Sequence, residues 1–151
     1  PEGGRVRLDT PRYQGAIGRA GEYATRHLTF DLETPFGAVQ LASLEAAPIA
    51  QARRLLLVTG ARVANTGMRW KDSSRQSLGA QWGGAPIRIE PVTGRLTLRG
   101  LEGARAVTLY PLDPCGQPAP EGKPLQAAGD GWTVTLDGRP ATAWYLIEVT
   151  R

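Results

Sequence analysis

Hydrophobic residues in this chain recur at every second position in short runs, the period of a β-strand with one buried face. Val6 and Leu8 alternate with charged residues, and Leu28, Phe30 and Leu32 alternate with polar ones. Similar runs follow at 36–44, 87–89, 96–98, 107–109, 132–136 and 145–149. The pattern predicts about nine or ten short strands.

Turn-forming residues separate these runs. The 151 residues include 19 Gly and 12 Pro, which suits many turns and few helices. The Thr34-Pro35 pair predicts a turn, so residues 27–44 are expected to form a hairpin. A short helix around Pro48, within 46–53, is the one helix candidate, and 111–131 is expected to be a long surface excursion.

Residues 54–59 break the alternation, because Leu55, Leu56, Leu57 and Val58 are consecutive. A continuous apolar run of this length is typical of a strand buried on both faces, although a short helix has the same appearance. We expect a strand here that is covered on both sides.

Length and patterning together predict a single all-β domain over residues 1–151. Its expected architecture is a two-sheet antiparallel β-sandwich of immunoglobulin-like or jelly-roll topology. Hydrophobic residues make up 41% of the chain, enough for a core without metals or disulfides. The chain starts at Pro1 without a signal-like segment, so we expect a piece of a larger modular protein.

Charge and cysteine content exclude some function classes. The net charge is +4, but only Arg53 and Arg54 are adjacent, so no nucleic-acid partner is expected. No apolar run approaches about 18 residues, so no membrane-spanning segment is expected. The single Cys115 lies in a turn-like sequence and is expected to be a dispensable loop thiol.

Catalytic chemistry finds little support in the sequence. The acidic residues are scattered and mark no carboxylate pair, and His27 is expected on a solvent-facing strand position. One Cys and one His cannot hold zinc, and no phosphate-binding loop opens a helix. We therefore expect neither a catalytic residue nor a metal or other cofactor, and a stand-alone enzyme is the least favoured hypothesis.

Sugar binding needs accessible aromatic rings beside polar side chains. Trp70 and Trp82 both adjoin Gly-rich or polar turns, whereas Trp132, Tyr145, Phe30 and Phe36 keep step with core positions. Trp144 alternates with core residues and is expected to point away from the core. The candidate ligand-binding residues are Trp70, Trp82, Tyr13, Arg69, Asp72, Arg75 and Gln81. The alternative for each Trp is a ring that caps the domain edge or packs on a neighbouring domain.

Four motifs in order carry a resemblance over roughly residues 5–100. They are the segments 8–15, 53–58, 65–70 (Asn-Thr-Gly-Met-Arg-Trp) and 82–92 (Trp-Gly-Gly-Ala-Pro-Ile-Arg-Ile-Glu-Pro-Val). Together they resemble the β-sandwich domain C-terminal to TIM-barrel catalytic domains in certain bacterial glycoside hydrolases. In that family the catalytic residues belong to the barrel, so the resemblance implies none here.

Two functions follow from this resemblance. The first is a non-catalytic carbohydrate-binding module of a secreted, polysaccharide-degrading enzyme, with a polysaccharide or oligosaccharide and the catalytic domain of the same polypeptide as partners. The second is a structural domain that packs on and stabilises the catalytic barrel without binding sugar. Exposed Trp70 and Trp82 rings favour the first function, and buried rings favour the second.

Overall fold

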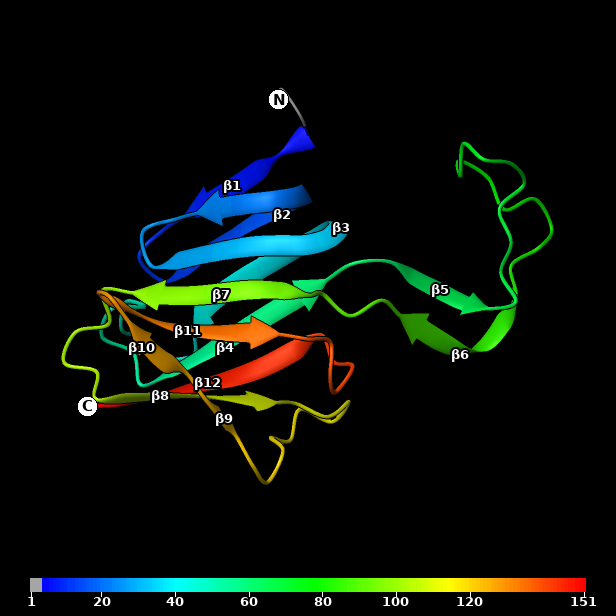
Figure 1. Cartoon of the computed structure of the whole chain (residues 1–151). Coiled ribbons are helices and arrows are strands. Elements are labelled where there is room, and N and C mark those ends of the chain that lie inside the picture. The colour runs from blue at the N-terminus through cyan, green and yellow to red at the C-terminus, as the bar shows by residue number, and fades with distance from the viewer. Residues whose placement is uncertain (1–3) are drawn as a thin grey trace.

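The computed structural model describes residues 4–151 and contains strands and loops, with no α-helix in that range. Every strand pairing is antiparallel, so the all-β prediction is confirmed. The strands are β1 (Val6–Asp9), β2 (Tyr13–Ala24), β3 (Leu28–Ser43), β4 (Arg54–Gly60), β5 (Val63–Thr66), β6 (Gly84–Ile89), β7 (Gly94–Arg99), β8 (Ala106–Pro111), β9 (Lys123–Pro124), β10 (Gln126–Ala128), β11 (Gly131–Leu136) and β12 (Trp144–Thr150) (Figure 1).

Ten of these strands form one curled sheet, called the body below. Its order is β10-β11-β7-β3-β4-β12-β8-β9, and β2 and β1 extend from β3. The two ends of that path, β9 and β10, are joined in the chain by Leu125, which is buried and donates its N–H to the Val107 carbonyl at 2.9 Å. The sheet is therefore nearly closed and barrel-like, and a sandwich of two separate sheets is not confirmed.

Strand β3 is the centre of this arrangement. It pairs along one edge with β2, and along the other with β7 up to Leu32 and with β4 from Ala38 onward. The predicted hairpin with its turn at Thr34-Pro35 is wrong, because these residues lie inside one continuous strand that changes neighbours there. Pro35 interrupts no ladder, since its position falls in the gap between the β7 and β4 pairings.

The change of neighbours also reverses the side chains of β3. Leu28, Phe30 and Leu32 are buried before it, and Val39 and Leu41 are buried after it, so the inward positions switch from even to odd numbers. A register shift in the pairing of β2 with β3, between Arg19 and Gly21 of β2, accompanies the switch. Phe36 consequently faces outward and is 50% exposed, so its predicted place in the core is wrong.

The core lines the inside of the curled sheet. Besides β3 it takes alternate residues from β4, β7, β8, β11 and β12, among them the buried Tyr145, whose phenol pKa is raised by burial. Trp132 packs against this core while remaining partly exposed.

Three local predictions differ from the structure. The segment 46–53 forms turns instead of a helix, and they place Ile49 in the core. His27 is buried instead of facing solvent. It lies just before β3, and its Nδ1 is 3.0 Å from the Arg99 carbonyl oxygen. The stretch 111–131 is not wholly an excursion, since it supplies β9 and β10, which bring the ends of the sheet path together.

Strands β5 and β6 stand apart from the body. They pair only with each other, and Figure 1 shows them projecting from one end of it with a long loop beyond. We call residues 61–92 the arm. An isolated two-stranded ribbon has no core of its own and is marginal in water.

The change of neighbours in β3 leads to a stability prediction. Thr34 is buried, and its Oγ1 accepts the Thr93 backbone N–H at 2.8 Å. Thr34→Val keeps the side-chain shape but leaves that donor without this partner, so it should lower the free energy of unfolding by about 1–3 kcal/mol. Thr108→Val, an outward β-branched substitution on β8, should change it by less than about 0.5 kcal/mol. Urea unfolding of both variants tests this; equal stabilities would contradict the role of Thr34.

Candidate functional site: the arm and an apolar sheet face

The arm has one apolar face. The register pairs Val63 with Ile89 and Asn65 with Ile87, so Val63, Ile87 and Ile89 share a side of the ribbon. Their side chains are 62%, 67% and 42% exposed. The opposite side carries Arg88 opposite Ala64. No described part of the body covers the aliphatic side.

The loop 67–83 at the end of the arm is braced by its own hydrogen bonds. The Asn65 side-chain amide donates to the Trp82 carbonyl at 3.0 Å, and the Arg69 N–H donates to the Gln81 carbonyl at 3.1 Å. Gly83 has a positive φ, and a Cβ there would collide with the Thr66 carbonyl oxygen, so the crossing of the two chain segments requires glycine. The loop is held in shape without a hydrophobic core.

Six of the seven predicted ligand residues lie together on this loop. Trp70 and Trp82 are 42% and 62% exposed, and the polar members are exposed too: Arg69, Asp72, Arg75 and Gln81. The Arg69–Gln81 hydrogen bond brings the two Trp-bearing segments side by side. Hydrogen bonds from the hydroxyl and the backbone N–H of Ser74 lower the pKa of Asp72, so its carboxylate is engaged within its own turn.

Tyr13 does not belong to this group. It lies on β2 of the body, opposite Ala42, and its hydroxyl donates to the Gln40 side-chain oxygen at 2.7 Å. The arm leaves the body beyond Gly60, and Gly60 pairs with Ala38, which lies nearer the start of β3 than Ala42 does. The structure therefore separates Tyr13 from the loop residues.

A second surface appears on the outside of the body, where β1, β2, the later half of β3, β4, β12 and β8 lie in order. Their registers place the outward side chains in rows, for example Ala42–Leu56–Leu146–Tyr110 and Gln40–Val58–Trp144. We call this the apolar outer face. Its members are half-buried or exposed, and they are Val6, Leu8, Tyr13, Ile17, Phe36, Ala38, Ala42, Leu56, Val58, Tyr110, Trp144 and Leu146.

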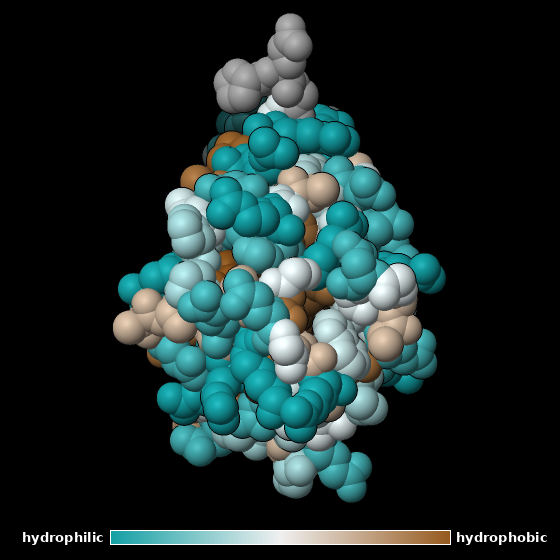
Figure 2. All heavy atoms as spheres, turned by 90° about the vertical axis from the view of Figure 1, so that its left-hand side faces the viewer, coloured by the Kyte–Doolittle hydropathy of each residue, from teal (hydrophilic) through white to brown (hydrophobic). Residues whose placement is uncertain are grey.

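The rest of the body surface is different in character. On the other half of the sheet the outward positions of β2, β3, β7 and β11 are polar or charged: Glu22, Thr29, Asp31, Glu33, Arg95, Thr97, Arg99 and Thr135. Figure 2 shows the end of the body away from the arm, and hydrophilic side chains cover most of it. Apolar surface is therefore concentrated on one face and on the arm.

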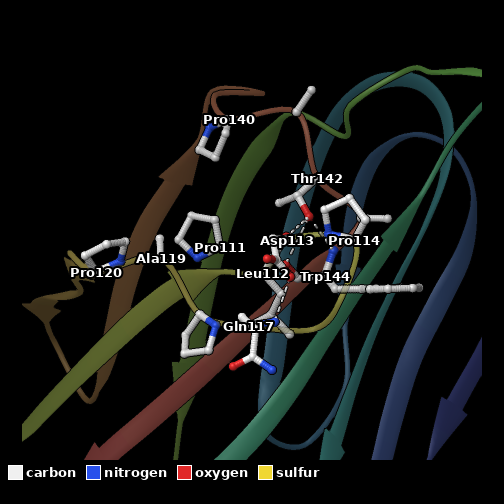
Figure 3. A pocket seen from close by; sticks show the side chains of 13 residues that line it. Pro111, Leu112, Asp113, Pro114, Gln117, Ala119, Pro120, Pro140, Thr142 and Trp144 are labelled. Atoms are coloured by element: carbon white, nitrogen blue, oxygen red, sulfur yellow. Dashed lines mark hydrogen bonds between the residues drawn. The ribbon is translucent and has the colours of Figure 1, made fainter. Parts of the chain in front are cut away.

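A groove of about 500 Å³ borders the apolar outer face at Trp144. Figure 3 shows the rings of Pro111, Pro120 and Pro140 on one side of it and the Trp144 indole on the other. The acidic residue that lines the groove is Asp113. Its carboxylate accepts hydrogen bonds from the backbone N–H groups of Cys115 and Gln117, both at 2.8 Å, and so stabilises the loop in which it lies. The groove offers apolar contact and no acid–base pair. Trp144 is 44% exposed, and its predicted outward orientation is confirmed.

The sequence already held a signal for the apolar outer face. In β4, Leu55 and Leu57 enter the core, while Leu56 and Val58 point outward and remain half-buried. A run that is apolar on both sides predicts cover on both sides. Here only the inner side is covered by described residues.

Other chemistry is sparse in the described residues. No group of three or more His, Cys, Asp or Glu residues lies close enough to hold a metal ion within 4–151. Cys115 is an exposed loop thiol, as predicted. Across the same range, the structure has no helix long and apolar enough to cross a membrane.

Comparison with known proteins yields no relative. No family model matches the chain, and neither a curated protein nor a solved structure matches it. Evidence for a function therefore comes from the two surfaces described above and from the motifs of the sequence.

The different positions of two tryptophans lead to a prediction. Trp82→Ala should change the free energy of unfolding by less than about 0.5 kcal/mol, because the exposed ring supports no core. Trp132→Ala should cost about 2 kcal/mol, less than the ~3–5 kcal/mol of a fully buried Trp. Thermal and urea unfolding measure both. A large loss of stability in Trp82→Ala would show that the arm is part of the folding unit.

Proposed function

We propose that the chain is a non-catalytic accessory domain that packs on another protein domain through its apolar outer face. The observation that carries this proposal is the continuous outward row of Leu56, Leu146 and Tyr110, with Val58 and Trp144 beside it. Monomeric proteins rarely leave a contiguous apolar sheet face uncovered, and such faces mark interaction sites.

The partner we propose is the catalytic barrel of a secreted glycoside hydrolase, joined to this domain in one polypeptide. The motif resemblance between residues 5 and 100 supports that choice, and the scattered acids of this chain leave catalysis to the partner. A stable interface buries about 800 Å² on each partner. Six adjacent strands with outward apolar residues provide a surface of suitable extent.

The docking proposal predicts a separation between folding and binding. Leu56→Lys and Leu146→Lys change outward, half-buried positions, so each should cost at most about 1 kcal/mol of stability. Each should weaken binding to the catalytic domain, supplied as a separate chain, by at least about tenfold, because a charge would be buried unpaired. Isothermal titration calorimetry measures the affinity.

Thr135→Lys is the matched control, since Thr135 is an outward residue on the polar half of the same sheet. It should bind as the unmodified chain does. Equal affinities for all three variants, or the absence of binding by the unmodified chain, would refute docking through this face.

Carbohydrate binding on the arm is the second candidate. The exposed rings of Trp70 and Trp82 meet the condition stated above for a sugar-binding module, and Arg69 and Gln81 are joined across the same loop. Docking is placed first because the apolar outer face spans six adjacent strands, whereas the loop offers two rings. Stacking of a sugar ring on one aromatic is worth about 1–2 kcal/mol by analogy with other stacking contacts. Binding of this kind is compatible with docking through the body, because the two surfaces share no residue.

Affinity electrophoresis against a panel of soluble polysaccharides tests the second candidate. Trp82→Ala should weaken binding about tenfold, since about 1.4 kcal/mol corresponds to a decade in affinity. Trp144→Ala removes a ring of about the same exposure as Trp70 from the other surface and should leave sugar binding unchanged. If Trp70→Ala and Trp82→Ala migrate like the unmodified chain on every retarding polysaccharide, the loop is not the sugar site.

A further inference from the structure

The aliphatic side of the arm packs against no other described part of the domain. Val63, Ile87 and Ile89 lie on one side of a ribbon that pairs with no other described strand, and Val63 and Ile87 are among the most exposed large hydrophobic residues described. Burying side chains of this type removes apolar surface from water, which favours binding. This stripe is therefore the part of the arm that gains most from a partner.

Charge narrows the chemistry of that partner. Residues 61–92 contain five basic residues (Arg62, Arg69, Lys71, Arg75, Arg88) and two acidic ones (Asp72, Glu90), a net charge of +3 out of +4 for the whole chain. Glu90 is paired with Arg62 at 3.7 Å, at the base of the arm. The other basic groups of the arm are Arg88, on the side opposite the aliphatic residues, and Arg69, Lys71 and Arg75, on the loop beyond them, so the arm as a whole is basic. An apolar surface with carboxylates at its rim complements both features.

Two other occupants fit less well. A lipid surface would require a continuous apolar end of the arm, but the polar and charged run 71–77 separates Trp70 from Trp82 on the loop, and the aliphatic residues lie in the strands nearer the body. A second copy of the chain would bring two arms of charge +3 together, which like-charge repulsion opposes.

The arm is also prepared for binding. The Thr66 hydroxyl donates to the Pro86 carbonyl at 2.8 Å, and the Lys71 N–H donates to the Ser77 carbonyl at 2.8 Å. With the Asn65–Trp82 bond these contacts link the ribbon to its loop, which has no hydrophobic core of its own. A preformed element loses less conformational entropy on binding than a flexible loop.

We infer that the arm is a second docking element, whose Val63–Ile87–Ile89 side seats on an apolar, carboxylate-rimmed surface of the same partner domain. This inference rests on the proposed function. It is supported by position, because the arm leaves β4 at Gly60, two residues beyond Val58, and Val58 pairs with Trp144 on the apolar outer face. The arm thus leaves the body at the edge of the apolar outer face.

The test titrates the catalytic domain, supplied as a separate chain, into arm variants of this protein. Val63→Ser combined with Ile87→Ser should weaken binding at least about tenfold. Ala127→Ser combined with Ala128→Ser changes two exposed apolar positions on β10, outside the apolar outer face, and should bind normally. Replacing Arg69, Lys71 and Arg75 by Gln should reduce the loss of affinity between about 50 mM and about 500 mM salt. The matched replacement of Arg26, Arg105 and Arg139 by Gln, all exposed on the body, should lose as much affinity over this salt range as the unmodified chain does.

The outcomes separate the two claims. Normal binding by the Val63/Ile87 variant, with binding lost in Leu56→Lys, would overturn the inference and leave the proposed function standing. Absence of binding by the unmodified chain would overturn both. Analytical ultracentrifugation covers the remaining occupant: a dimer of the unmodified chain that the Val63/Ile87 variant abolishes would assign the stripe to a second copy and overturn the inference.

Discussion

The fold depends on one constraint: β3 must serve two sets of neighbours. Its first half pairs with β7 and its second half with β4, while β2 pairs with both halves on the other edge. The change of neighbours around Thr34 and Pro35 switches the inward residues from Phe30 and Leu32 to Val39 and Leu41. Without that switch, one half of β3 would turn its apolar side chains to solvent and the sheet could not curl around a single core.

The same constraint creates two unlike outer surfaces. Before the bend, the outward residues of β3 and β7 are polar or charged, such as Asp31 and Arg95. After it, the outward residues of β3, β4 and β12 are mostly apolar, such as Ala42, Leu56 and Leu146. Sheets commonly keep one face wet and one buried. Here one part of the sheet has apolar residues on both faces, and the arm also has an aliphatic side that no described residue covers. We propose a protein partner for both surfaces.

The period of two in the sequence predicted the strands and most of the core, because local alternation reflects local burial. It failed at Phe36, where the bend shifts the phase, and at 27–44, where Thr34-Pro35 looks like a turn but occupies a gap in the ladder. The exposed loop tryptophans follow from their turn residues. The apolar outer face depends on which strands lie side by side, and only the consecutive Leu55 to Val58 hinted at it. The detached arm gave no sequence signal, since Ile87 and Ile89 alternate like core residues.

Hydroxyl-radical footprinting tests the central claim most directly, because it measures the solvent accessibility of individual side chains. The measurement compares this chain alone with the same chain mixed with the catalytic domain. Our account predicts protection of Trp144, Leu56, Leu146 and Tyr110 in the mixture, with no change at the outward residues of the polar half. Unchanged labelling of the apolar outer face at saturating partner, or protection confined to the polar half, would contradict it.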